Sequence, residues 1–275
     1  SVICWKNTAK SRDGRLWQSI RTNKYILAIS GNDIFSGGGL YADLATYTTN
    51  HLHGFLAVTC LTALTDKGFE VFATDDEVFD HQLNSLKDVP FSGIKLGLLP
   101  NVRLADKALE FVKEHKEIPI VLDPVLVCKE KHDVEVSALR DELLKFFPYV
   151  TIITPNLVEA ELLTQMTIKT LDDMKAVAKR LVDLGAKHVV IKGGNRLSKE
   201  QAIDVFYDGK DYEVFETAVL DSNNIGAGCT FASSIASQLV LGKSAKEAVA
   251  VSKEFVYQAI RHSDKYGVKQ NYDEK

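Results

Sequence analysis

The fold of this chain is decided by the stretch TIITPNLVEAELLT, residues 151–164. Its first four residues form a short run typical of a buried strand, and the residues from Leu157 onward follow a helical pattern. Pro155 and Asn156 stand between the two, where a strand is expected to turn into a helix. A strand that passes directly into a helix is the unit of a layered sheet, so further units of this kind are expected on either side.

The same alternation runs through most of the chain. Strands are predicted at residues 25–30, 55–61, 93–98, 119–122, 151–154 and 188–191. Helices are predicted at residues 40–49, 76–86, 102–114, 137–147, 157–164, 172–184, 229–241 and 245–261. Most of the strands are Val/Ile/Leu runs, which indicates parallel strands covered on both faces. Two alternating runs, 202–206 and 212–215, flank Asp208-Gly209-Lys210 and predict an antiparallel hairpin. The sequence therefore predicts a three-layer α/β/α fold, with a mainly parallel central sheet and an antiparallel edge hairpin.

Composition points to a protein that handles small molecules. The 275 residues include 33 Lys and Arg against 37 Asp and Glu, a net charge of −4, which is too mild to favour nucleic acid or an anionic membrane as partner. Hydrophobic residues make up 45% and charged residues 25%, as in an ordinary globular protein. We expect one domain over residues 24–265 and a polar C-terminal tail over residues 266–275.

Cysteine usage and the N-terminal segment bear on the compartment. The four cysteines are far apart and form no C-x-x-C pair, which favours a reducing cytoplasm. No apolar stretch is long enough to cross a membrane. Residues 1–23 carry five basic residues and one acid but no apolar core of a secretory signal. We interpret them as an extension on the surface, natural or added to the chain, in preference to a targeting peptide.

Unusual residues follow the predicted strands, where open α/β sheets bind their ligands. They are Gly31-Asn32-Asp33, Gly97, Asp123-Pro124, Pro155-Asn156 with Glu159, Lys192-Gly193-Gly194 and, at a helix start, Gly226-Ala227-Gly228-Cys229. Phosphate chemistry would use all of these residue types.

The stretch Gly226-Ala227-Gly228-Cys229 has the character of an anion hole. Its small residues let the backbone present several N–H groups to an anion at the positive end of a helix. A glycine-rich turn that only begins a helix would have the same sequence pattern. Lys192-Gly193-Gly194 is a second segment suited to binding phosphate, and it favours the interpretation as an anion hole.

Asn156 and Glu159 are candidates for a magnesium site. They stand three residues apart at a helix start, on the same face. With Asp123 as a further carboxylate, they could hold a hydrated Mg²⁺, which keeps its waters and the substrate phosphates as ligands. Helix capping explains Asn156 and Glu159 equally well.

Other motifs are weaker. Gly37-x-Gly39-x-x-Ala42 resembles a dinucleotide fingerprint, but residues 32–36 separate it from the first strand, so NAD binding is disfavoured. The chain has no G-x-x-x-x-G-K-[ST] motif of a P-loop. The histidines show no metal spacing beyond His51-x-His53.

Taken together and in order, these motifs resemble the ribokinase superfamily. The residues that carry the resemblance are Ser30-Gly31-Asn32-Asp33, Ser36-Gly37-Gly38-Gly39, Ala42-Asp43-Leu44, Asp123-Pro124-Val125, residues 154–160, Ile191-Lys192-Gly193-Gly194 and residues 226–230. The match is to the branch of hydroxymethylpyrimidine (phosphate) kinases and their pyridoxal kinase relatives, and it covers about residues 25–260.

The resemblance implies a role for each matched residue. It assigns Gly226, Ala227, Gly228 and Cys229 to the anion hole, Asn156 and Glu159 to Mg²⁺ and phosphate, Lys192 and Gly193 to the ATP phosphates, and Asp33, with Gly31 and Tyr41, to the substrate. Cys229 stands where many superfamily members have a catalytic Asp, and cysteine there marks this branch. Cys128 matches the second cysteine of a subset that looks like two-cysteine pyridoxal kinases.

The chain departs from the branch in its substrate pocket. Tyr41 replaces a common Gln, Leu96-Gly97-Leu98-Leu99 replaces Thr-Gly-Met-Leu, and Ile225 replaces a His before the anion hole. These positions bear on the choice between pyrimidine and pyridoxal more than on ATP.

The resulting hypothesis is an ATP- and Mg²⁺-dependent kinase that phosphorylates the hydroxymethyl group of pyridoxal, pyridoxine or pyridoxamine. Lys192 would offset charge, Cys229, with a pKa lowered by its helix N-terminus, would accept the alcohol proton, and Cys128 would add to the aldehyde of pyridoxal. The alternatives are a hydroxymethylpyrimidine kinase of thiamin synthesis, alone or in addition, a NAD-dependent oxidoreductase and a non-catalytic vitamin-binding protein. The relatives imply a homodimer, and the sequence leaves a requirement for a monovalent cation open.

Overall fold

The structure is a computed structural model that describes residues 24–126 and 133–272. The predictions for residues 1–23 and for Cys128 lie outside these residues. The strands are β1 (Tyr25–Ser30), β2 (His53–Val58), β3 (Cys60–Thr65), β4 (Gly68–Ala73), β5 (Phe91–Leu96), β6 (Ile120–Leu122), β7 (Ile152–Ile153), β8 (Val189–Lys192), β9 (Gln201–Tyr207) and β10 (Tyr212–Ala218). The helices are α1 (Gly39–Thr49), α2 (Asp76–Leu86), α3 (Val102–Glu114), α4 (Asp133–Leu144), α5 (Leu157–Thr164), α6 (Leu171–Asp183), α7 (Ala227–Val240) and α8 (Ala245–Arg261), with a short 3-10 turn at Phe147–Tyr149.

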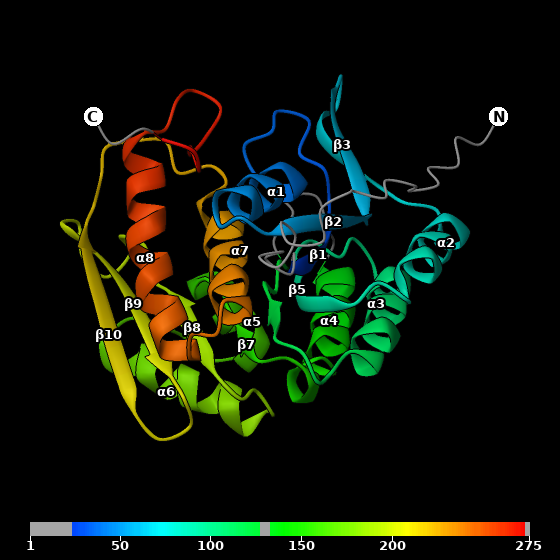
Figure 1. Ribbon diagram of the computed structural model, residues 1–275. Coiled ribbons are helices and arrows are strands. Elements are labelled where there is room, and N and C mark those ends of the chain that lie inside the picture. Colours follow the sequence, from blue (N-terminus) through cyan, green and yellow to red (C-terminus); the bar gives the residue numbers. More distant parts are fainter. Residues whose placement is uncertain (1–23, 127–132, 273–275) are drawn as a thin grey trace, which may run out of the picture.

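Eight strands form the central sheet in the order β10-β9-β8-β7-β6-β5-β1-β2 (Figure 1). The strands from β8 to β2 pair in parallel. β9 pairs antiparallel with both β8 and β10 and so makes the hairpin at one edge. The predicted α/β/α fold, with its mainly parallel sheet and antiparallel edge, is confirmed.

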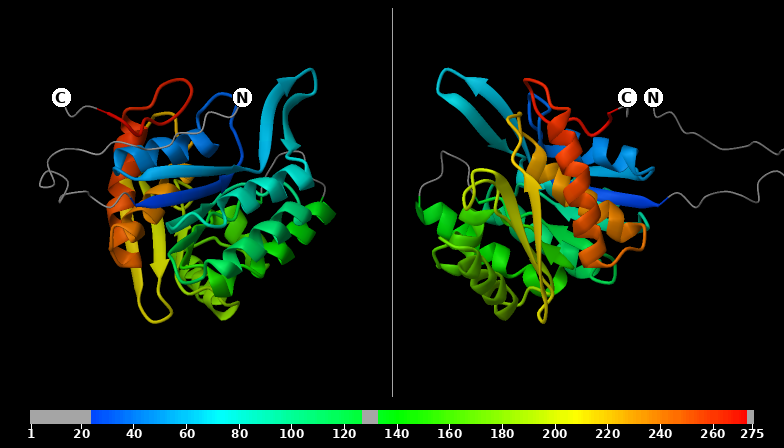
Figure 2. Two further views of the ribbon diagram at one scale, coloured as in Figure 1. Left: turned by 45° about the vertical axis from the view of Figure 1, so that its right-hand side comes forward. Right: turned by 90° about the vertical axis from the view of Figure 1, so that its left-hand side faces the viewer.

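Helices cover the two faces of the sheet as separate layers. Along β1, Leu27 and Ile29 pack in the core that contains α2 to α6, whereas Ile26 and Ala28 pack in the core that contains α1, α7 and α8. This follows from the period of two along a strand, which sends successive side chains to opposite faces. The two turned views show the helices on both sides of the sheet (Figure 2).

A second sheet, of β3 and β4 alone, was not expected from the sequence. The predicted strand at 55–61 is divided, because β2 ends at Val58 and β3 begins at Cys60. The turn between β3 and β4 pairs Thr65 with Gly68, whose φ of +108° suits glycine. This small sheet projects from the body of the molecule (Figures 1 and 2).

The polar C-terminal tail predicted over residues 266–275 contacts the domain through Val268 and Gln270. The backbone N–H of Val268 donates to the carbonyl of Ile225 over 3.0 Å. The side chain of Gln270 is buried and donates to the Thr230 hydroxyl over 2.9 Å. Polar composition suggested a tail, but these polar groups find partners inside the fold. No helix within residues 24–126 and 133–272 is long and apolar enough to span a bilayer.

Candidate active site

Three predicted site residues meet at the carboxyl edge of the sheet. Asp123 follows β6, Asn156 follows β7 and Lys192 ends β8. Asn156 and Lys192 form an isolated parallel bridge, and the Lys192 N–H donates to the Pro155 carbonyl over 2.9 Å. Neighbouring parallel strands end at one edge, which is why residues 69 positions apart, such as Asp123 and Lys192, become neighbours.

Lys192 holds a positive charge at this edge. Its Nζ lies 3.1 Å from Asp123 Oδ1, which also accepts a hydrogen bond of 3.0 Å from the Thr154 hydroxyl. Burial lowers the pKa of Lys192, but the carboxylates of Asp123 and Glu159 outweigh burial and raise the pKa above its ordinary value. Lys192 is therefore charged at neutral pH.

The first turn of α7 lies beside this ammonium group. A β-carbon on Gly228 would be 3.3 Å from Lys192 Nζ. Gly226 precedes the helix with a φ of +84°, and a β-carbon there would overlap the carbonyl oxygen of Gly37. No side chain among the described residues caps this helix. The Ala227 N–H donates to the Asn224 carbonyl over 3.0 Å, and among the described residues no acceptor engages the N–H groups of Gly228 and Cys229. These two N–H groups lie at the positive end of the helix and can bind an anion.

Cys229 lies in the first turn of α7, against the glycine-rich segment Gly37-Gly38-Gly39. Its Sγ accepts a hydrogen bond of 3.4 Å from the N–H of Gly39. Burial raises the pKa of the Cys229 thiol, whereas the ammonium of Lys95 lowers it and the carboxylates of Asp43 and Asp123 raise it further. The sequence predicted that the helix N-terminus lowers this pKa, and that prediction is wrong. The pKa is raised, because desolvation of the thiolate is the largest effect.

Asn156 and Glu159 form a capping box at the start of α5. The Asn156 N–H donates to Glu159 Oε2 over 2.8 Å, and the Glu159 N–H donates to Asn156 Oδ1 over 2.9 Å. The capping interpretation left open by the sequence is thus present in the structure. Burial raises the pKa of Glu159 to about 7, with Asp123 raising it and Lys192 lowering it.

Asp123, Asn156 and Glu159 are the predicted ligands of a magnesium ion. Within the described part of the chain, no group of three or more His, Cys, Asp or Glu side chains could hold a metal. Asp123 and Glu159 are nevertheless close enough to affect each other, and Asn156 lines the adjoining cavity. Such a set suits an ion held through its waters and through phosphate oxygens, which is how Mg²⁺ binds beside nucleotides.

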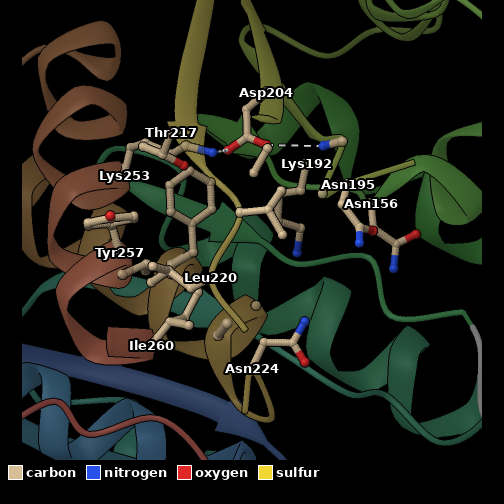
Figure 3. Close-up of a pocket in the computed structure, with 18 of the residues that line it drawn as sticks. Asn156, Lys192, Asn195, Asp204, Thr217, Leu220, Asn224, Lys253, Tyr257 and Ile260 are labelled. Carbon is tan, nitrogen blue, oxygen red and sulfur yellow. Dashed lines mark hydrogen bonds and ion pairs between the residues drawn. The ribbon is translucent and has the colours of Figure 1, made fainter. Parts of the chain in front are cut away.

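A cavity of about 530 Å³ opens from this edge (Figure 3). Its polar lining includes Asn156, Lys192, Asp204 and Lys253, and its apolar lining includes Leu220, Phe231, Val256, Tyr257 and Ile260. The volume and the mixture of apolar and polar side chains suit a ligand with a planar base and phosphates. These five apolar residues come from α7, α8 and the segment after β10.

An ion pair not found from the sequence supports the cavity wall. Asp204 on β9 accepts a hydrogen bond of 3.0 Å from the N–H of Gly193, and its other oxygen lies 2.7 Å from Lys253 Nζ (Figure 3). A β-carbon on Gly193 would overlap the carbonyl oxygen of Ile203, so glycine is required there. Asp204 interrupts the apolar pattern of its strand, and that was the available signal.

The predicted substrate residues Gly31, Asp33 and Tyr41 are not among the residues that line this cavity, and they lie between β1 and α1 or on α1 itself. Asp33 accepts hydrogen bonds from the N–H groups of Phe35, Gly37 and Gly38, so its carboxylate shapes the loop before α1. A β-carbon on Gly31 would overlap the Cys60 sulfur. Asp33 lies near Gly38, which in turn lies near Cys229, whereas the Tyr41 side chain is half exposed on α1.

The model of the family described as phosphomethylpyrimidine kinase matches residues 33–273. The chain belongs to this family. It is 38% identical to "Pyridoxine kinase" of Bacillus subtilis over 247 residues, 86% of this chain and 90% of that protein. It is 36% identical to "Hydroxymethylpyrimidine/phosphomethylpyrimidine kinase" of Aquifex aeolicus, over 88% of this chain and 96% of that protein. The structure of the pyridoxal kinase from Staphylococcus aureus with AMP-PCP and pyridoxal matches with a TM-score of 0.83 and 33% identity, over 90% of this chain and 93% of that one. These matches confirm the resemblance read from the motifs.

Ile225, one of the positions at which the chain departs from the branch, packs against the loop before α1. It is half exposed, and a β-carbon on Gly37 would lie 2.6 Å from its Cγ2. Phe35 and Tyr266 stack at 12° with ring centroids 6.5 Å apart. The sequence carries no signal for Tyr266 as a neighbour of Phe35, because only the folded chain brings the C-terminal segment back to the loop before α1.

Proposed function

We propose that this protein is an ATP-dependent kinase that phosphorylates the hydroxymethyl group of pyridoxal, pyridoxine or pyridoxamine. The observation that carries the proposal is that Lys192 and Gly228 both line the 530 Å³ cavity, with Cys229 next to Gly228 in the first turn of α7. A nucleotide in the cavity would direct its phosphates toward Lys192 and Gly228. The relatives named as pyridoxine and pyridoxal kinases support the choice of acceptor.

In the proposed reaction the substrate hydroxyl oxygen attacks the γ-phosphorus as the bond to the ADP oxygen breaks. The first-turn N–H groups at Gly226–Cys229 hold the transferring phosphoryl group, and Lys192 offsets charge on the phosphate oxygens. Cys229 accepts the alcohol proton as its thiolate. Phosphoryl transfer asks little covalent chemistry of the protein, so positioning and charge account for most of the catalysis.

A magnesium ion is part of this proposal. Asn156, Glu159 and Asp123 would hold it beside the phosphates, and when bound it would supply neutralising positive charge between the phosphate oxygens. Whether a monovalent cation is needed as well is decided by assaying the enzyme with and without K⁺.

Phosphorylation of hydroxymethylpyrimidine is the second candidate. The family description and the Aquifex aeolicus relative favour it. The test measures ATP consumption with pyridoxal, pyridoxine and hydroxymethylpyrimidine side by side. We expect the highest kcat/KM with a B6 vitamer. A clear preference for hydroxymethylpyrimidine would replace the first proposal by the second, and ATP consumption with none of the three would overturn both.

We also propose a homodimer in a reducing, cytoplasmic setting. The β3–β4 sheet exposes Leu61 with its cross-strand partner Phe72, and Leu64 with its partner Phe69. A two-stranded sheet is marginally stable alone, so a second copy that covers these side chains would stabilise it. Light scattering should give twice the chain mass for the parent and a lower mass for Leu64→Glu. A reducing compartment would keep the Cys229 thiol in the form that the reaction uses.

A further inference from the structure

A buried ion pair lies beneath the candidate site and has no part in the mechanism above. Lys95 Nζ on β5 lies 2.7 Å from Asp43 Oδ1 on α1, and both side chains are 0% exposed. The Ser233 hydroxyl on α7 donates to the same oxygen. Among the described residues, no hydrogen-bond donor reaches Asp43 Oδ2. Burying such a pair costs desolvation, and an apolar pair in its place is often as stable.

The geometry links this cluster to Cys229 through two helices. Ser233 follows Cys229 by four residues on α7, and Asp43 follows Gly39 by four residues on α1. Residues four apart lie one above the other on a helix, separated by about 6 Å. The Gly39–Cys229 hydrogen bond therefore links α1 to α7 at their first turns. One turn further along both helices, the Asp43–Ser233 hydrogen bond links them again.

Lys95 connects the Asp43–Ser233 contact to strand β5 of the sheet. Its ammonium group lies at the carboxyl end of β5, where a β-carbon on Gly97 would be 2.9 Å from Nζ. Burial lowers the pKa of Lys95, but the negative charges of Asp43, Cys229 and Asp123 outweigh burial and raise it, so the lysine stays charged. The charged groups that act on the Cys229 sulfur are thus Lys95 from β5, Asp43 from α1, Asp123 after β6 and Lys192 from β8.

We propose that Lys95, together with Asp43 and Ser233, is a positioning cluster that holds the Cys229 sulfur against the Gly39 N–H and supplies the positive charge that supports its thiolate. The cluster does not touch the substrate. It sets the separation of two helix N-termini, those of α1 and α7, between which the acceptor hydroxyl would lie. This inference rests on the proposed function for its catalytic consequence, but the state of the thiol can be measured without any turnover.

The test uses the double variant Asp43→Asn/Lys95→Met, which removes both charges and leaves no buried ion unpaired. Asp80→Asn/Lys107→Met is the matched control, because it makes the same substitutions in the exposed pair between α2 and α3, whose atoms lie 2.6 Å apart. Alkylation of Cys229 by iodoacetamide is followed by peptide mass spectrometry as a function of pH. Lys95 lowers the pKa of the Cys229 thiol more than Asp43 raises it. The alkylation profile of the double variant should therefore shift to higher pH, while that of the control stays with the parent.

Turnover provides the second readout. We expect kcat of the double variant to fall roughly tenfold to a hundredfold, with KM for ATP unchanged, because a small displacement of a reacting group is enough for such a loss. An alkylation profile that coincides with that of the parent, in a variant that is folded by circular dichroism, would overturn the proposal and leave the cluster a structural role. If the parent has no kinase activity but the alkylation profile still shifts, the proposed function fails and the positioning of the thiol stands.

Discussion

The ammonium nitrogen of Lys192 lies so close to Gly228 that a β-carbon on this glycine would be 3.3 Å from it. Residues from the end of a strand and the start of a helix thus form one surface, with an ammonium group and the first N–H groups of α7 side by side. Glycine at this position leaves room for phosphate oxygens between them.

Gly228→Ala should leave the fold intact and weaken the binding of the ATP phosphates. Alanine suits a helix, so α7 is retained, but its methyl group displaces the Lys192 ammonium. We expect kcat/KM for ATP to fall by roughly tenfold or more, equivalent to about 1.4 kcal/mol. Gly226→Ala provides the contrast, since its φ of +84° alone costs roughly 1–2 kcal/mol in a residue with a β-carbon. Thermal melts should show lower stability for Gly226→Ala only; equal melting for both, with full activity, would contradict the arrangement.

Cys229→Ala should lower turnover with little change in ATP affinity. The N–H groups of the proposed anion hole remain, but the proposed proton acceptor is lost, and loss of a general base typically costs about 10²–10⁴-fold. Burial raises the pKa of this thiol, so its thiolate fraction, and with it the kcat of the parent, should increase from about pH 6.5 to 9. The profile of the variant should lose this increase. Turnover within a few-fold of the parent would reduce Cys229 to a packing residue.

Glu159→Gln should change how stability depends on pH. The folded-state pKa of Glu159 is raised to about 7, above its ordinary value of 4.5, so its contribution is fully present below about pH 4.5 and is lost as pH rises through 7. Gln can still accept the N–H of Asn156, which preserves the capping box. The free energy of unfolding of the parent minus that of the variant should therefore decrease between these pH values, as urea titrations can measure. A difference that grows with pH would show that Glu159 is stabilised as a carboxylate instead.

Cys128→Ala separates substrates with and without an aldehyde. Cys128 lies outside the described residues, and its role rests on the resemblance to two-cysteine pyridoxal kinases and on thiol chemistry. A thiolate adds reversibly to the aldehyde of pyridoxal to give a hemithioacetal, whereas pyridoxine carries only an alcohol there. Steady-state kinetics should show a larger loss with pyridoxal than with pyridoxine. Small, equal losses on both would remove the covalent role.

Removing residues 266–275 tests whether the C-terminal segment supports the site. The truncation deletes Gln270, which bonds Thr230 on α7, and Val268, which bonds the Ile225 carbonyl before the anion hole. It also removes Tyr266, which stacks on Phe35. We expect KM for the vitamin substrate to rise more than KM for ATP. Gln270→Ala alone should show a smaller effect in the same direction, and unchanged kinetics in both would make the segment dispensable.

Local patterns in the sequence were enough to predict the layered fold. Strand β1 and helices α2, α3, α5 and α8 have the predicted boundaries, and each of these four helices begins after a residue whose side chain caps it. The positions of Asp123, Asn156 and Lys192 at one edge also followed, since parallel strands that end in polar residues gather them there. The β3–β4 sheet was missed because its alternating pattern continued that of β2 in one apolar stretch.

The sequence by itself determined which residue types follow each strand, and hence the kind of chemistry at the sheet edge. Only the tertiary structure decided which of them interact, because ion pairs and burial depend on contacts between distant segments. Lys95 and Asp43 are 52 positions apart and read as ordinary charges, yet they form a fully buried pair one turn below Cys229. Burial also reversed the expected direction of the pKa shift of Cys229. Desolvation depends on all the groups packed around the sulfur, and the helix N-terminus is only one of them.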